Sequence, residues 1–136
     1  MAMILLYLLL PAGHSFAATT PAIPTLQATA WEAILTFFLM MVIIAVATDA
    51  RAVGTMAGAA IGATVMLCAF MGGPVTGASM NPARSLAPAL FQGTESSLWI
   101  YFLGPSIGAL SAAFLYGWMR TEPSTQKRAN PSRLTK

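Results

Sequence analysis

The sequence predicts an all-α membrane protein with three transmembrane helices, one re-entrant half-helix and a partial N-terminal helix. Composition is the first observation, because 57% of the residues are hydrophobic and only 8% are charged, against about 25% charged residues in a soluble domain. The second observation is three nearly uncharged stretches that each approach the ~20 residues needed to cross a bilayer. The third is a polar segment at 72–92, between the last two stretches, which carries prolines, glycines, an Asn and an Arg.

The first ten residues, MAMILLYLLL, are apolar but too short to span a bilayer. Two interpretations stay open. In one, residues 1–13 are the truncated outer end of a transmembrane helix. In the other, residues 1–18 are a signal peptide, since small residues follow the apolar core, although no basic residue precedes it. Both place residues 14–29, rich in Pro, Thr and Ala, in an irregular extracellular linker.

The predicted spans cover residues 31–48, 52–71 and 98–119, and the distribution of positive charge orients them. Five of the seven Lys and Arg residues follow the last span, and such an excess marks the cytoplasmic side of a membrane. The tail at 120–136, which we expect to be disordered, is therefore cytoplasmic in a multi-pass protein of the plasma membrane. The connector that carries Arg51 then also lies inside. Arg84 falls on the outer side, where topology gives no reason for a positive charge.

Small residues recur within the spans at helical spacing. Glycines at 54, 58 and 62 stand four residues apart, as do those at 104 and 108. Because small residues let helix backbones approach closely in lipid, both sets predict helix-packing faces. Cys68 lies inside the second span, where a buried, inert thiol is expected.

Glu32 lies near the outer end of the first span. It is either a carboxylate that reaches the membrane interface or an intramembrane acid that faces other protein, since a charge exposed to lipid is costly. The residues alone leave both interpretations open.

The polar segment at 72–92 predicts a short helix that enters the membrane and returns to the same side. Its glycines and Pro74 are expected to end the preceding helix at Gly72. Asn81 is a favourable N-cap, Pro82 suits the first helical position, and residues 83–90 are compatible with a short helix. About ten residues at ~1.5 Å each give ~15 Å, half of a ~30 Å hydrocarbon core.

Irregular backbone at membrane depth is tolerated only where protein buries it or a water-filled space receives its polar groups. We therefore expect this segment to line a pore. Free carbonyl groups from about Val75 to Met80, including those of Ser79 and Met80 themselves, would offer acceptors, and the Asn81 amide would offer donors. The positive end of the half-helix and Arg84 would oppose cations. The alternative is an ordinary outer loop with a surface helix.

The segment Asn81-Pro82-Ala83-Arg84, with TGAS before it and RSLAPAL after it, resembles the second signature loop of the aquaporin, or major intrinsic protein, family. WEAILTFFLMMVIIAVATDARAVG is similar to the family's fourth helix and WIYFLGPSIGAL to its sixth. The resemblance covers nearly the whole chain. It implies the C-terminal half-repeat of an aquaporin-like fold at residues 30–119.

The resemblance also implies roles for individual residues. Glu32 matches a glutamate that supports the backbone of the pore loop, and Arg84 matches the arginine of the selectivity filter. Counting back from Asn81 without gaps places two further filter positions at Ala69 and Ala78. Water-selective members have a histidine at the first of these, so Ala69 implies a wider constriction. Small filter residues are typical of members that pass glycerol, urea or neutral metalloid hydroxides, and the chain looks most similar to the nodulin-26-like and related bacterial aquaglyceroporin branch.

The chain departs from the family pattern because it carries one half-repeat and no second Asn-Pro-Ala triplet. One half-helix cannot enclose a pore alone. Three explanations stay open: a fragment of a longer protein, a subunit that pairs with a separate first half, and self-association, which meets the objection that inverted repeats need opposite orientations. A homotetramer is what the resemblance implies for the full channel.

Other functional classes fit less well. A small membrane interaction protein without transport activity would use the same glycine faces but has no need of Asn81 and Arg84. An enzyme is poorly supported, because the single His, the single Cys and the four acids form no pair at catalytic spacing. No cofactor and no metal are implied. The basic residues gather in the tail without interleaved aromatics, which argues against nucleic acid as a partner.

Overall fold

The computed structural model describes residues 5, 8–9, 18–48, 54–93 and 95–120. The helices, in chain order, are α2 (Thr25–Ala47), the 3-10 turn η1 (Gly54–Met56), α3 (Ala57–Thr76), α4 (Pro82–Gln92), the 3-10 turn η2 (Glu95–Ser97) and α5 (Leu98–Met119). The expectations for residues 1–13 and for the tail after Arg120 lie almost wholly outside the described residues.

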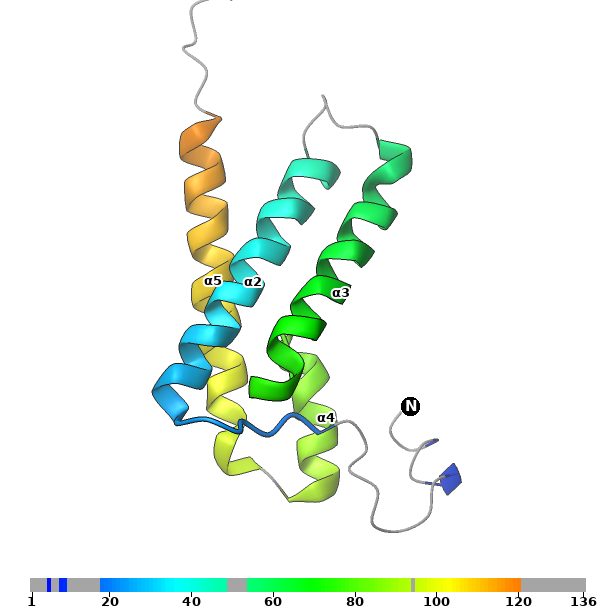
Figure 1. Cartoon of the computed structure of the whole chain (residues 1–136), viewed down its shortest axis with the longest axis vertical. Helices are drawn as coiled ribbons and strands as arrows, with labels where there is room; N and C mark the ends of the chain where they lie inside the picture. The colour runs from blue at the N-terminus through cyan, green and yellow to red at the C-terminus, as the bar shows by residue number, and fades with distance from the viewer. Residues whose placement is uncertain (1–4, 6–7, 10–17, 49–53, 94, 121–136) are drawn as a thin grey trace, which may run out of the picture.

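Three long helices lie side by side and the short helix α4 sits at one end of them (Figure 1). Among the described residues, the segments long and apolar enough to cross a membrane are Thr25–Ala47, Ala57–Thr76 and Glu95–Met119. α2 contacts both α5 and α3, and α4 packs on α5. Figure 1 shows α4 at the end of the bundle where α2 begins and α3 ends. The predicted arrangement of three spans with one short helix between the last two is therefore confirmed.

Large apolar side chains cover the outside of this bundle. Phe70, Phe114 and Trp118 are 76%, 79% and 71% exposed. Exposed apolar area of this extent is unusual on a soluble monomer but suits contact with lipid. The two clusters of buried apolar residues, by contrast, lie where α2 meets its neighbours: Ala28 with Ile100 and Tyr101, and Leu35 with Cys68 and Ala78.

The bounds of α2 and α3 differ from the predicted spans. α2 begins at Thr25 rather than at 31, because no helix-breaking residue follows Pro24. The last residues of the predicted linker therefore belong to the helix. α3 continues to Thr76, so the prediction that the helix ends at Gly72 was wrong. Pro74 lacks an N–H for the hydrogen-bond ladder but lies inside α3, and the helix is ended by Gly77, which adopts φ 84°. α5 coincides with the predicted 98–119.

One of the two predicted glycine faces is used within the chain. A Cβ at Gly104 would lie 2.8 Å from the Thr29 carbonyl oxygen, and one at Gly108 would collide with the carbonyl of Ala33. These glycines therefore let the α5 backbone rest on that of α2. On α3, a Cβ at Gly58 or Gly62 would meet nothing within 4 Å, so the described part of this chain supplies no partner for that face.

We expect Gly108→Ala to lower the free energy of unfolding by about 1–3 kcal/mol, the usual cost of overpacking a tight contact. The added methyl group meets backbone atoms of α2, which cannot rotate away. Gly62→Ala is the matched control, because its methyl group enters open space and Ala favours helix over Gly by about 1 kcal/mol. Unfolding of both variants in detergent, followed by circular dichroism, tests this. Equal stability of the two variants would contradict the close contact.

Candidate pore-lining site

The chain passes from α3 to α4 through five non-helical residues, 77–81. Ala78 and Met80 adopt positive φ values of 44° and 52°, which are unfavourable for residues with a side chain and typically cost about 1–3 kcal/mol each. Ser79 lies between these two strained positions. Such a loop needs strong interactions to hold it.

Glu32 supplies these interactions from α2. Its side chain is fully buried. Its Oε1 accepts hydrogen bonds from the Thr76 hydroxyl at 2.7 Å and from the Ser79 N–H at 2.9 Å, and its Oε2 accepts one from the Met80 N–H at 2.8 Å. The Thr76 hydroxyl oxygen in turn accepts a hydrogen bond from the Ala78 N–H at 3.2 Å. The sequence left two interpretations of Glu32 open. The structure agrees with the second, because the carboxylate faces protein at the signature loop.

Asn81 begins α4. Its backbone is extended, with φ −153° and ψ 115°, and its Oδ1 accepts a hydrogen bond from the Ala83 N–H at 2.9 Å. Pro82 follows at the first helical position. The predicted N-cap and half-helix are therefore present, and α4 extends to Gln92, two residues beyond the predicted 83–90. The Nδ2 group of Asn81 makes no hydrogen bond to any described residue, so no described acceptor uses its two N–H donors.

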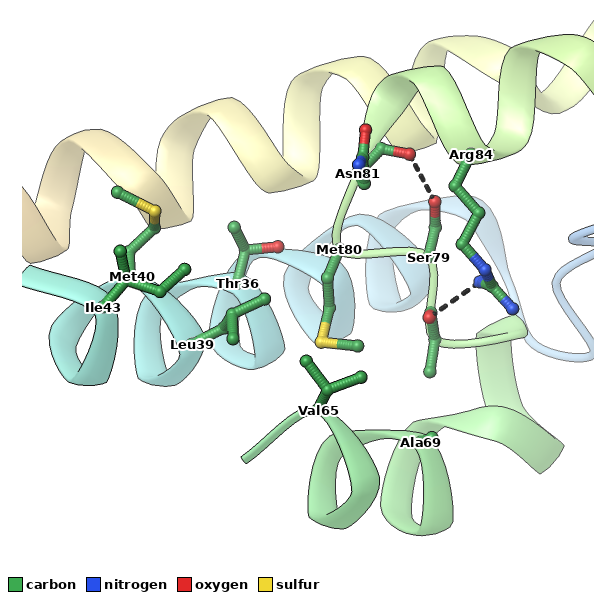
Figure 2. A pocket seen from close by; sticks show the side chains of 11 residues that line it. Thr36, Leu39, Met40, Ile43, Val65, Ala69, Ser79, Met80, Asn81 and Arg84 are labelled. Atoms are coloured by element: carbon green, nitrogen blue, oxygen red, sulfur yellow. Dashed lines mark hydrogen bonds between the residues drawn. The ribbon is translucent and has the colours of Figure 1, made fainter. Parts of the chain in front are cut away.

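Arg84 lies one turn into α4 and its side chain returns to the loop. Its Nη1 donates hydrogen bonds to the carbonyl oxygens of Gly77 at 2.9 Å and Ala78 at 2.8 Å. Its other N–H groups bond to no residue that the structure describes. Figure 2 shows this guanidinium beside the loop. The side chain thus offers one positive charge and several donors that no described residue uses.

The prediction of free carbonyls from Val75 to Met80 was largely wrong. The Val75 carbonyl accepts from the Ala22 N–H at 2.9 Å, that of Thr76 accepts from the Tyr101 hydroxyl at 2.7 Å, and Arg84 occupies the next two. Only the carbonyls of Ser79 and Met80 have no hydrogen-bond donor among the described residues. Since a carbonyl oxygen has two lone pairs, the occupied groups keep some capacity to accept.

A cavity of about 400 Å³ lies between α2, α3 and the loop. The six residues that the sequence singles out for solute contact all line it: Asn81, Arg84, Ala69, Ala78, Ser79 and Met80. Figure 2 shows the labelled members facing a common space. The hydroxyl of Ser79 is occupied, however, because it donates to the Asn81 carbonyl at 2.8 Å. Glu32 stands behind the loop and does not line the cavity.

Sequence reasoning missed the opposite wall of the cavity. Its members are Thr36, Leu39, Met40 and Ile43 on α2 and Val65 on α3. The four on α2 recur at spacings of three and four residues, so they share one helix face. That periodicity was the available signal, but it was hidden because nearly every residue of α2 is apolar.

The described residues contain no group of three or more His, Cys, Asp or Glu side chains that would hold a metal ion. Cys68 is buried, as expected, with its thiol 3.7 Å from the Leu35 carbonyl oxygen.

A capped short helix that lies beside three apolar spans and presents an Asn amide and an Arg to a cavity defines a class of helical, polytopic membrane protein. The chain belongs to the major intrinsic protein family, whose sequence model matches residues 1–116. It is accordingly an integral, multi-pass membrane protein in contact with the lipid bilayer.

Three relatives illustrate the similarity. Nodulin-26 of Glycine max is 53% identical over 116 residues, which are 85% of this chain and 43% of that protein. Aquaporin NIP2-3 of Zea mays is 49% identical over 80% of this chain and 38% of its own length. Aquaporin NIP3-1 of Arabidopsis thaliana is 51% identical over 80% of this chain and 34% of its own length. The chain thus spans less than half the length of the relatives it matches.

Proposed function

We propose that this chain is the second half of a passive channel for water and small neutral solutes. The observation that carries the proposal is the convergence of Asn81, Arg84, Ala69 and Ala78 on one cavity. The N–H groups of Asn81 and Arg84 that no described residue uses share this cavity with apolar side chains of α2, those of Leu39, Met40 and Ile43. A hydroxylated solute would bind the polar wall and slide along the apolar one, which suits diffusion without chemistry or a cofactor. Relatives named as aquaporins support the same function.

Ala69 and Ala78 would set the width of the constriction, with Arg84 as its third side. Both side chains are single methyl groups, so they leave room for a solute larger than water. Glycerol, urea and neutral metalloid hydroxides are the solutes we propose. The similarity to nodulin-26 and its relatives supports this branch of the family.

Cations would be rejected by two features of the same loop. The guanidinium of Arg84 carries a permanent positive charge. The N-terminus of α4, at Asn81, adds the positive end of a helix dipole. Together they would raise the energy of a cation at the constriction, whereas the energy of a neutral solute would change little.

A complete pore would require a first half-repeat opposite this one. The unpartnered glycine face of α3, at Gly58 and Gly62, suits close contact with a helix from that missing half. We further propose that the full channel is a homotetramer in the plasma membrane, with residues 14–24 outside the cell and the tail after Arg120 in the cytoplasm. Glu32 would support the pore loop.

The alternative is a small membrane interaction protein without transport activity. The same glycine face of α3 favours it, because that face would bind a helix whether or not solute passes. The two functions differ in what Asn81 must do, since helix binding does not require its amide group.

The test is stopped-flow light scattering of liposomes under water and glycerol gradients. The 136-residue chain is reconstituted alone and together with the part of the soybean relative that it does not cover. We expect permeability above that of empty liposomes only in the combined sample. Asn81→Asp, which replaces the free amide donors by a carboxylate, is expected to reduce glycerol flux at least tenfold, by the loss of about two hydrogen bonds.

Each result is decisive. Combined liposomes that stay as tight as empty ones, although the two parts bind one another, would refute the channel and leave the interaction protein. Rapid glycerol flux through the chain alone would show that copies of one half-repeat assemble a pore without an inverted partner.

A further inference from the structure

Thr19 belongs to the linker before α2 and does not line the cavity, yet its side chain is buried. Its hydroxyl oxygen lies 2.6 Å from that of Ser85 on α4, and the Ser85 oxygen lies 2.6 Å from that of Ser79 in the loop. Ser79 donates to the Asn81 carbonyl at 2.8 Å. Three hydroxyl groups thus connect the linker to the residue that begins the half-helix.

The direction of this chain of hydrogen bonds follows from the number of protons. Each hydroxyl group has one proton to donate. The Asn81 carbonyl can only accept, so Ser79 uses its proton there and must accept from Ser85. Ser85 has then used its proton and must accept from Thr19. Thr19 is therefore the first donor of the chain.

Two further contacts join the linker to the last turn of α3 and to the first residue of the loop. The Ala22 N–H donates to the Val75 carbonyl at 2.9 Å. A Cβ added at Gly77 would lie 3.0 Å from the Thr19 Cγ2 atom, so Thr19 rests directly on the residue that ends α3. The linker consequently contacts the loop at its beginning and, through the hydroxyl chain, at its end.

Ser79 is held from two sides. Its N–H donates to Glu32 on α2, and its hydroxyl group is engaged by the chain that starts at Thr19. The residues on either side of it, Ala78 and Met80, both adopt strained positive φ values. Strained backbone persists only where the surroundings over-determine it. For Ser79 itself, the hydroxyl chain is a support that does not pass through Glu32.

We infer that Thr19 is a positioning residue for the pore loop, which acts through Ser85 and Ser79 to hold the Asn81 carbonyl and thereby the width of the constriction. This inference rests on the proposed function only where it concerns solutes. Its structural part concerns the order of residues 77–81 and is tested without any flux.

The experiment compares three variants of the 136-residue chain in lipid nanodiscs by hydrogen–deuterium exchange. Thr19→Val keeps the shape of the side chain but removes the hydroxyl group, Thr19→Ser keeps the hydroxyl group, and Thr20→Val alters an exposed neighbour. We expect exchange of the Ser79 and Met80 amides to quicken about tenfold in Thr19→Val, as the loss of one buried hydrogen bond predicts. Thr19→Ser and Thr20→Val should match the unaltered chain.

Permeability provides the second measurement. It uses liposomes that hold the 136-residue chain together with the part of the soybean relative that the chain does not cover. We expect Thr19→Val to change the ratio of glycerol to erythritol flux at least threefold and Thr19→Ser to restore it. Unchanged amide exchange in Thr19→Val would overturn the inference, as would quickened exchange in Thr19→Ser or an unchanged flux ratio in a working channel. Quickened exchange in Thr19→Val alone, in a protein that passes no solute, would uphold the positioning role and refute the channel separately.

Discussion

Glu32→Gln is expected to lower the free energy of unfolding by about 3 kcal/mol, because charge-assisted hydrogen bonds in a buried site are worth about 1.5–3 kcal/mol each. The substitution keeps the shape of the side chain. Its amide oxygen can replace Oε1, which serves Thr76 and Ser79. Its NH₂ group, however, then faces the Met80 N–H, which bonds to Oε2 at 2.8 Å in this chain. Two donors would meet there without an acceptor.

Glu95→Gln is the matched control for this prediction. Glu95 is exposed and lies in the turn η2, so removal of its charge should change stability by less than about 0.5 kcal/mol. Both variants are unfolded in detergent, and the exchange of the loop amides is measured in parallel. If Glu32→Gln unfolds like Glu95→Gln and keeps its loop protected, the carboxylate is not what holds the strained residues.

The N-cap and half-helix are the part of the site that local sequence predicts well. Asn81 and Pro82 each favour one position at a helix start for a reason confined to their own backbone. The partners of Glu32 are different, because Thr76, Ser79 and Met80 lie more than forty residues away. The sequence around Glu32 did not decide whether its carboxylate reaches the membrane interface or faces other protein. Its expected role came from the family resemblance, and its hydrogen bonds came from the structure.

The end of α3 shows why other parts of the fold and of the site could not be predicted from the sequence. Glycines and Pro74 normally stop a helix, but Gly72 is where Leu35 of α2 packs so closely that a Cβ would collide with it. The glycine therefore serves contact between helices rather than a turn. The same holds for Arg84, because its hydrogen bonds to the carbonyls of Gly77 and Ala78 depend on where α4 lies relative to the loop. Tertiary packing decided both positions.

Arg84 has two separable functions in the proposed channel, one through its charge and one through its geometry. The charge would repel cations. The Nη1 group also occupies the carbonyl oxygens of Gly77 and Ala78, which would otherwise offer ligands to a cation. Removal of the side chain abolishes both effects at once, so its consequence for selectivity should exceed that of any other single change in the cavity.

Arg84→Val is expected to admit sodium ions when the chain is reconstituted together with the uncovered part of the soybean relative. A unit charge at about 4 Å with an effective dielectric constant near 20 contributes ~4 kcal/mol, which sets an upper limit of about a thousandfold on the increase in sodium flux. Tracer uptake into liposomes measures it, with glycerol flux as the reference. Arg84→Lys is the matched control, because it keeps the charge but not the planar group that bonds both carbonyls. We expect it to reject sodium while its glycerol flux changes. Sodium exclusion by a glycerol-permeable Arg84→Val channel would assign charge rejection to the N-terminus of α4 instead.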